Sequence, residues 1–324
     1  MEGGLRALAW LAGVVPRRAI NVLGALLGWF VGSILRVRRD HVEAAMREAG
    51  IAFAPKEAAA MYRSLGASVW EFLRLSARGS EMTAGVAFEG FSRARWASAL
   101  GYGRGVVVAA SHTGNWDLVA CAMARHVELL VITKRLSVRP LDSFWQSTRA
   151  AHGVLLADGP GALARARSVL ARGGAVAMMI DQVPRPNAHA IEAIFLGRDA
   201  VVDRGPALLA LACGAPLLVA ASRRREAGDS ADHLVEVLDV LQPPSRQARG
   251  RRAWVDTATI AATQALENFV RAHPSQWLWL HRRWKRLDLP AREATMSAAC
   301  HQELLRSPRP ATRSSLQGAS SKAD

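Results

Sequence analysis

The stretch "GVVVAASHTGNWDLVACAMARH", residues 105–126, decides the fold class. Its first part, 105–111, is a short run rich in valine, which has the length and β-branched composition of a buried strand. The apolar run 116–125 that follows is typical of a helix, and His112 and Asp117 lie at the junction. A strand that leads directly into a helix predicts an α/β domain.

The rest of the chain continues this alternation. We expect further strands at 127–133, 175–181, 216–222 and 234–241, and helices at 40–80, 161–173, 205–214 and 257–274. Short apolar strands between amphipathic helices predict a mainly parallel central sheet flanked by helices. The α/β domain is expected to cover residues 40–288. The tail 289–324 is rich in Ser, Ala, Arg and Pro, a composition that predicts disorder.

Residues 1–39 are expected to form a membrane-associated segment. The run "AINVLGALLGWFVGSIL", residues 19–35, contains no charge and has arginines on both sides. A helix that spans a bilayer needs about 20 apolar residues, with a lower limit near 17. The run therefore predicts either a short transmembrane helix or a helix lying in the membrane interface. A buried core helix is the alternative interpretation.

Composition points to an anionic partner and a reducing compartment. The 324 residues carry a formal net charge of +15, which favours nucleic acid, anionic lipid or an acidic carrier protein. The three cysteines, Cys121, Cys213 and Cys300, are far apart and form no CxxC pair, which argues against a disulfide framework. The nine histidines show no spacing typical of metal ligands, so we expect no metal site.

His112 and Asp117 form the first candidate catalytic pair. Functional residues of parallel sheets gather at the carboxyl ends of strands, where His112 is expected. Asp117 would fall in the first turn of the next helix and would orient the imidazole for general-base catalysis. Because the chain has no GxSxG motif, the base would activate a hydroxyl of a substrate. The alternative is a simple helix cap.

Three further markers lie outside this motif. Asp181 and Gln182 end another apolar strand, and Arg149 precedes a loop. In the stretch "HPSQWLWLHRRWKR", residues 273–286, aromatic and basic residues alternate. Such a pattern suits the stacking of nucleic-acid bases or a membrane interface with anionic lipid.

Taken together, these pieces resemble the lipid A secondary acyltransferase family of Gram-negative bacteria over roughly residues 20–287. The resemblance rests on the motifs "SHTGNWD", "DQ" at 181–182, "IFLGRDAVVDRGPALLALACGAPLLVAASRRR" at 194–225 and "PSQWLWLHRRWK" at 274–285. It implies a glycerolipid-acyltransferase-like fold. It also implies transfer of a fatty acyl chain from acyl-carrier protein to a glycolipid hydroxyl, in lipopolysaccharide biosynthesis at the cytoplasmic face of the inner membrane.

The resemblance also implies roles for four residues. His112 would be the general base and Asp117 would support it. Arg149 would contact an acceptor phosphate or the developing oxyanion, and Asp181 would hold that arginine or the loop of the active site. No cofactor is implied beyond the acyl donor, which is acyl-carrier protein thioester or acyl-CoA.

Four more residues are weaker candidates. Asn115 and Arg283 are expected to bind substrate, Arg283 by docking the carrier protein. Lys134 and His281 could act at the site, and each has an equally good structural interpretation.

Two alternatives remain open at this point. The first is an acyltransferase for a lysophospholipid or another glycolipid, which would use the same chemistry. The second is a basic protein without catalytic activity that binds membranes or nucleic acid, although the leading interpretation involves no nucleic acid.

Overall fold

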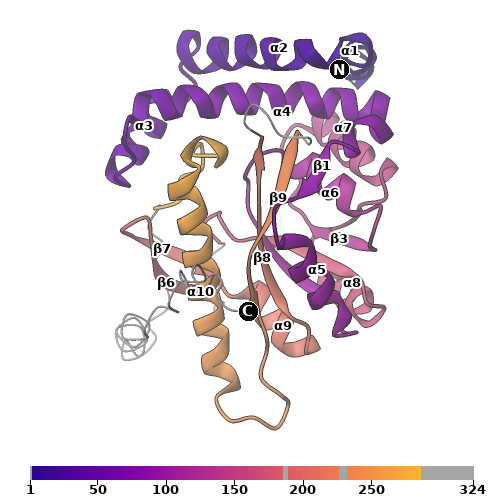
Figure 1. Cartoon of the computed structure of the whole chain (residues 1–324), viewed down its shortest axis with the longest axis vertical. Helices are drawn as coiled ribbons and strands as arrows, with labels where there is room; N and C mark the ends of the chain where they lie inside the picture. Colours follow the sequence, from indigo (N-terminus) through magenta and orange to yellow (C-terminus); the bar gives the residue numbers. More distant parts are fainter. Residues whose placement is uncertain (1, 185–188, 226–231, 286–324) are drawn as a thin grey trace, which may run out of the picture. The chain divides into compact units, whose positions relative to one another are not determined.

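A seven-stranded sheet forms the centre of the molecule (Figure 1). The structure is a computed structural model, and it describes residues 2–184, 189–225 and 232–285. The strand order is β1-β9-β8-β2-β5-β3-β4. The strands are β1 (Val86–Phe88), β2 (Val106–Ala110), β3 (Leu129–Ile132), β4 (Leu155–Ala157), β5 (Ala175–Met179), β8 (Leu217–Arg224) and β9 (His233–Leu241). The tail 289–324 lies outside the described residues.

The sheet is mainly parallel, which confirms the predicted fold class. The consecutive pairs β8–β2, β2–β5, β5–β3 and β3–β4 are parallel, and β1 pairs in parallel with β9. Only the β8–β9 pair is antiparallel among the described strands of this sheet. A short link, residues 225–232, joins these two strands, and a parallel crossover would need a longer connection.

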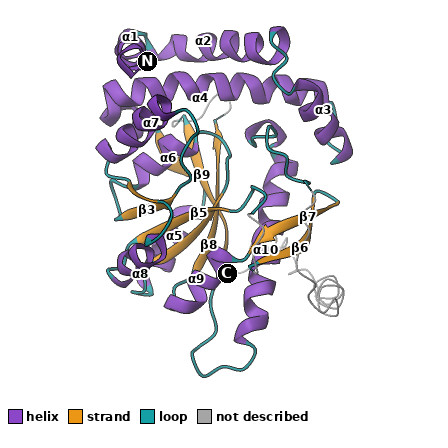
Figure 2. Cartoon of the chain, turned by 180° about the vertical axis from the view of Figure 1, so that it is seen from behind, coloured by secondary structure: helices purple, strands orange, loops and turns teal. Residues whose placement is uncertain are grey.

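Helices cover both faces of the sheet (Figure 2). On one face, Val107 and Ala109 of β2 share a core with α8 (Ala162–Ala171), α9 (Gly205–Cys213) and α10 (Arg251–Ala272). On the other face, Val106 and Val108 pack with α5 (Ser92–Gly101) and α6 (Trp116–Met123). The valine run is apolar throughout because alternate side chains of a strand point to opposite, equally buried faces.

A layer of helices lies beyond the sheet. It contains α1 (Glu2–Val14), α2 (Arg17–Trp29), a π-helical segment (Phe30–Ile34), α3 (Arg39–Glu48) and α4 (Ala54–Thr83). α2 runs along α4 at a separation that only glycine permits (Figure 1). A Cβ on Gly28 would lie 2.3 Å from the Tyr62 carbonyl oxygen, and one on Gly24 would lie 2.4 Å from Ala67 Cα. Small residues at four-residue spacing thus seat α2 directly on α4.

The uncharged run 19–35 does not form one straight span. Among the described residues, no single helix has the length and hydropathy of a membrane span. A pair of helices, 19–34 and 39–48, meets those criteria together with a bend of 90° between them. α1 and α2 pack on α4 within the same compact unit as the sheet, and the division at residue 39 stays a prediction.

Several elements were not predicted. They are β1, β4, α5, α7 (Arg139–Ala151) and the hairpin of β6 (Ala190–Phe195) and β7 (Arg198–Asp203). Leu196 and Gly197 connect the hairpin, with φ values of +54° and +76°. Two left-handed residues make a type I′ turn, which normally takes Asn-Gly or Gly-Gly. Leucine at the first position hides this signal in the sequence.

Candidate active site

The register of the sheet brings His112 and Asp181 together. Strands β2 and β5 are parallel neighbours, and Ala110 pairs with Met179 at their carboxyl ends. His112 and Asp181 each lie two residues beyond these ends. The backbone N–H of His112 donates to Asp181 Oδ2 at 2.7 Å, and its Nδ1 lies 2.9 Å from Oδ1. Trp277 Nε1 donates to Oδ2 at 2.9 Å, so the fully buried carboxylate accepts three N–H groups.

These contacts fix the tautomer of His112. Burial raises the pKa of Asp181, but the attraction and hydrogen bond of His112 outweigh burial and hold that pKa well below its usual range. An ionised carboxylate only accepts, so the proton of the imidazole is on Nδ1 and Nε2 is left as an acceptor. Burial lowers the pKa of His112, but the charge and hydrogen bond of Asp181 outweigh burial. The pKa of this imidazole is therefore raised above its usual value of 6.5.

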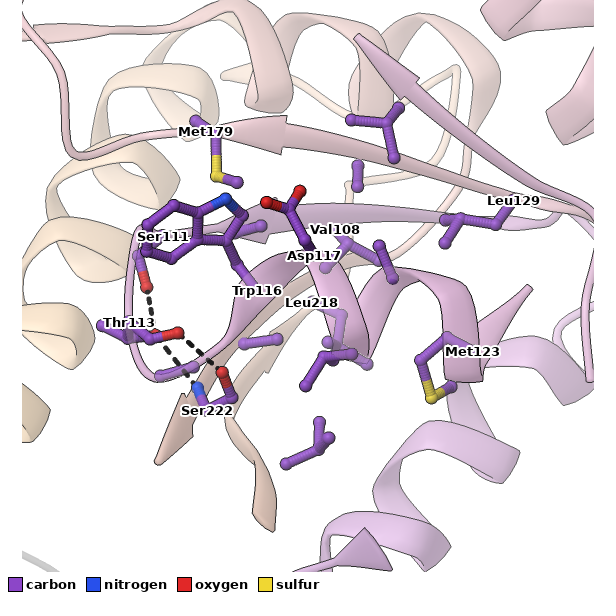
Figure 3. Close-up of a pocket in the computed structure, with 18 of the residues that line it drawn as sticks. Val108, Ser111, Thr113, Trp116, Asp117, Met123, Leu129, Met179, Leu218 and Ser222 are labelled. Atoms are coloured by element: carbon purple, nitrogen blue, oxygen red, sulfur yellow. Dashed lines mark hydrogen bonds between the residues drawn. The ribbon is translucent and has the colours of Figure 1, made fainter. Parts of the chain in front are cut away.

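The loop that carries His112 is anchored on two sides. The His112 carbonyl accepts from Leu278 N at 3.0 Å, and the Gln276 carbonyl accepts from Gly114 N at 2.8 Å. On the other side, Ser222 Oγ donates to the Thr113 carbonyl at 2.7 Å and Ser222 N donates to Thr113 Oγ1 at 3.0 Å (Figure 3). These bonds hold the backbone of the predicted strand–helix junction in place.

Asp117 is not the partner of His112 that the spacing predicted. It lies in the first turn of α6 and faces α7, where Trp145 Nε1 donates to its Oδ2 at 3.0 Å. Arg149 donates to its Oδ1 from Nε at 2.8 Å and also from Nη2. The five-residue offset turns Asp117 toward the neighbouring helix, whereas the strand register places Asp181 beside the imidazole. Asp181 therefore orients His112, and Asp117 holds Arg149.

An apolar cavity of about 100 Å³ lies between the sheet and the helices α5 and α6. Ser111, Thr113, Asp117 and Arg149 are among the few polar residues that line it. Figure 3 shows Ser111 and Thr113 on one side of the cavity and Met123 and Leu129 on the other. The remaining lining includes Trp96, Val108, Ala120, Ala177, Leu218 and Val237. The cavity thus offers an apolar chain a place that begins beside the His112 loop.

His281 lies against the candidate base. The two imidazole rings are 4.8 Å apart between centroids and nearly perpendicular. Burial, together with the charge of His112, lowers the pKa of His281 to about 4, so this ring is neutral near pH 7. His112, Asp181 and His281 offer ligand atoms within 4.8 Å of one another. Hydrogen bonds already connect this cluster, because His112 Nδ1 lies 2.9 Å from Asp181 Oδ1 and the other carboxylate oxygen accepts from His112 N and Trp277 Nε1.

Two other predicted residues have buried roles. The side chain of Arg283 is 1% exposed and Nη1 donates to the Val201 carbonyl at 2.6 Å, so the prediction that it docks a carrier protein is wrong. Asn115, predicted to bind substrate, is also buried and caps α6 by accepting from Leu118 N at 3.2 Å. Lys134 is exposed just after β3.

The aromatic and basic stretch 273–286 is not a surface for stacking bases. Trp277 and Trp279 are both buried in the main core, and Trp284 packs against that core. Trp277 instead supports the site through its bond to Asp181. The interleaved arginines suggested an exposed face, but the tryptophans point inward.

Sequence reasoning missed Glu71 and Gln276. Gln276 precedes Trp277 and anchors Gly114, and Glu71 reaches the loop from α4. Glu71 lies inside a long amphipathic helix, and no signal in the sequence separates it from a surface glutamate.

Comparison with known proteins identifies the family of the chain. A search of the curated proteins found no match. A family model described as bacterial lipid A biosynthesis acyltransferase matches residues 5–286, a range that begins within α1 and contains the sheet, the His112 loop and the helices α2–α10. Because this match covers most of the chain, the protein belongs to the bacterial lipid A biosynthesis acyltransferase family.

Proposed function

We propose that the protein transfers a fatty acyl chain from an acyl-carrier protein thioester to a hydroxyl of a lipid A precursor, with His112 as general base. Membership of the family supports acyl transfer. The observation that carries the mechanism is the fixed tautomer of His112: Asp181 holds Nδ1, and Nε2 is left to accept a proton. Acyl transfer to an alcohol requires such a base.

The proposed reaction needs no covalent enzyme intermediate. His112 Nε2 takes the proton of the acceptor hydroxyl while the oxygen of that hydroxyl attacks the thioester carbonyl carbon. The tetrahedral intermediate collapses, the C–S bond breaks, and the thiolate leaves with the proton from the imidazolium. The products are an ester and a free thiol. Cys121 is no competing nucleophile, because burial raises the pKa of its thiol to about 12.

Arg149 is the proposed partner of the developing oxyanion. Arg149 lines the same apolar cavity as Ser111 and Thr113, the two residues on either side of His112. Asp117 fixes this guanidinium by hydrogen bonds to Nε and Nη2. A cation that is held in place before the reaction stabilises developing negative charge without reorganisation.

The donor can be tested directly with purified protein. We would offer acyl-carrier protein and CoA thioesters of the same acyl chain, each with a lipid A precursor or a lysophospholipid, and detect products by mass spectrometry. We expect transfer from the carrier thioester to the glycolipid, because a net charge of +15 favours an acidic carrier protein. Transfer only from CoA, or only to the lysophospholipid, would overturn the donor or the acceptor in this proposal.

Activity should fall on acidification with a midpoint above pH 6.5. The base works only when His112 is neutral, and its pKa is raised above 6.5 because Asp181 outweighs burial. Turnover is therefore high above this raised pKa and is lost as pH decreases through it. The measurement is kcat between pH 5 and 9 with saturating substrates. A midpoint at or below pH 6.5 would contradict the proposed pairing.

Narrowing the cavity should shift the choice of acyl chain. Ala120→Leu adds carbon atoms to the lining between α6 and the sheet. Because each buried CH₂ is worth ~0.8 kcal/mol, we expect about a tenfold shift in kcat/KM toward donors two carbons shorter. Ala171→Leu, at an exposed position of α8, is the matched control and should change nothing. Unaltered chain preference in Ala120→Leu would place the acyl chain elsewhere.

The outer helices are the proposed membrane contact. Exposed apolar side chains recur on α1 and α2, namely Leu8, Trp10, Leu11, Val14, Val22, Leu26 and Trp29. A helix with such a stripe lies in the interface between lipid headgroups and acyl chains. This placement would bring the site to an acceptor in the cytoplasmic leaflet of the inner membrane.

Replacing Val22 and Leu26 by Glu should weaken binding to anionic vesicles at least about 100-fold, since burying each side chain is worth ~1.5 kcal/mol or more. Vesicle cosedimentation measures this binding. Tyr102→Glu/Leu163→Glu is the matched control, because these exposed residues lie just after α5 and in α8, two helices well away from α2 in Figure 1. Equal loss in both double variants would mean that the apolar stripe is not the contact.

A further inference from the structure

A buried carboxylate of α4 reaches the catalytic loop. Glu71 is 5% exposed, and its Oε2 accepts from Asn115 Nδ2 at 2.8 Å. Arg224, at the end of β8, donates to both oxygens of Glu71, at 2.7 Å to Oε2. His233 Nε2, at the start of β9, lies 3.2 Å from Oε2. One carboxylate therefore joins α4, β8, β9 and the loop before α6.

Glu71 is held as an anion. Burial raises the pKa of its carboxyl, but the charges of His233 and Arg224 outweigh burial and keep that pKa well below its usual range. A buried carboxylate without partners would be strongly unfavourable, and this one is tolerated because positive groups and an amide surround it. Burying these charged groups carries a desolvation penalty, so we ask what the cluster does beside the catalytic loop.

Asn115 connects the cluster to the loop, because its amide group makes two hydrogen bonds. Its Oδ1 accepts from Leu118 N and caps α6, while its Nδ2 donates to Glu71. The second bond decides which way the amide faces and so which atom caps the helix. Asn115 lies three residues after His112 and two before Asp117. Fixing its side chain fixes the backbone between the base and the residue that holds Arg149.

The same cluster reaches the loop by a second route. The backbone N–H of Arg224 donates to Gln276 Oε1 at 2.8 Å, and the Gln276 carbonyl accepts from Gly114 N. Two residues further on, Leu278 N donates to the His112 carbonyl. Glu71 thus holds Asn115 directly and supports His112 and Gly114 through Arg224. Neither Glu71 nor Asn115 lines the apolar cavity, so neither is placed to contact the acyl chain.

We propose that Glu71 is a positioning residue, whose hydrogen bond to Asn115 sets the geometry of His112 relative to the Asp117–Arg149 pair. The proposal rests on the proposed function only for its effect on turnover. A displacement of about 1 Å of a catalytic group costs on the order of 10²-fold in rate. Loss of this bond should therefore lower kcat and leave KM nearly unchanged.

An exchange of donor and acceptor tests the bond itself. Asn115→Asp keeps the cap but places two carboxylates in contact, and Glu71→Gln removes the anion. The double variant Glu71→Gln/Asn115→Asp restores one amide and one carboxylate with the roles reversed, and it keeps one negative charge near Arg224. We expect kcat to fall about 10²-fold in each single variant. KM should stay within about twofold, and the double variant should recover at least about tenfold over the weaker single variant.

Controls separate positioning from simple loss of stability. Ser68→Ala removes another hydrogen bond of Arg224 that does not touch the loop and should keep wild-type kcat. Melting temperatures of all variants accompany the kinetics. Singles that keep kcat within twofold while losing stability, or a double variant without recovery, would overturn the proposal. Asn115→Ser, which shortens the side chain and retains a capping oxygen, gives the same test if Glu71→Gln does not fold.

A second readout does not depend on turnover. The ¹⁵N and ¹H resonances of His112 Nδ1 report its bond to Asp181. We expect them to shift or broaden in the single variants and to return in the double variant. If wild-type protein transfers no acyl chain but these resonances behave so, the proposed function fails and the positioning role stands. Resonances that are the same in every variant would remove the positioning role.

Discussion

His112→Ala should lower kcat by about 10²–10⁴-fold, the usual contribution of a general base. The alanine cannot take the proton of the acceptor hydroxyl, and no other described side chain is placed to replace it. His281 is the nearest imidazole, but a pKa of about 4 makes it a poor base, and its ring packs against His112. The variant should fold, because the His112 backbone N–H and carbonyl keep their bonds to Asp181 and Leu278.

The measurement is turnover of a carrier-bound thioester at saturating substrate, together with the melting temperature. His126→Ala is the matched control, because His126 is exposed just after α6 and far from any role in the proposed reaction. Its kcat should equal that of wild type. An active His112→Ala variant would remove the base from the mechanism.

Asp181→Asn should cost about 10³–10⁴-fold in kcat, the scale seen when the carboxylate behind a catalytic histidine becomes an amide. The backbone N–H of His112 and Trp277 Nε1 both point at Oδ2, so the amide oxygen must take that position. The NH₂ group then faces His112 Nδ1, which has to accept. The imidazole proton moves to Nε2, and the ring can no longer act as a base there.

This effect differs from a loss of folding. Asp181→Asn keeps the size of the side chain and two of its three accepted bonds, so we expect a folded protein with a lower melting temperature. The pKa of His112, followed by NMR, should fall because the charge that raises it is gone. Asp158→Asn, an exposed carboxylate paired with Arg135, is the control. Normal turnover in Asp181→Asn would show that the tautomer of His112 does not limit the reaction.

The sequence was sufficient for five of the seven strands of the sheet, because local pattern and tertiary context agree there, but it missed the three-residue strands β1 and β4. The runs 105–111, 175–181 and 216–222 are short and apolar, and they become β2, β5 and β8, which pair with one another in parallel. The hairpin of β6 and β7 escaped prediction because Leu196 occupies a left-handed position that leucine rarely takes. The strand β9 was predicted, but its antiparallel direction was not, because hydropathy does not indicate the direction in which a strand runs.

Four residues of the candidate site were named from the sequence, but their pairing was not predicted. His112, Asp117, Arg149 and Asp181 were all named, but spacing along the chain favoured Asp117 as the partner of His112. The partner is decided across the sheet, by the register that places Ala110 opposite Met179. Arg283 misled for a related reason, because a run of charged residues does not reveal that the side chain of its second arginine is buried.

The central claim is that this protein adds an acyl chain to a glycolipid by means of His112. We would delete it from cells, return either wild type or His112→Ala, and compare total lipids by mass spectrometry. The account predicts that one glycolipid loses the mass of one acyl chain, and that wild type alone restores it. Full restoration by His112→Ala, or lipids that do not change on deletion, would contradict the account.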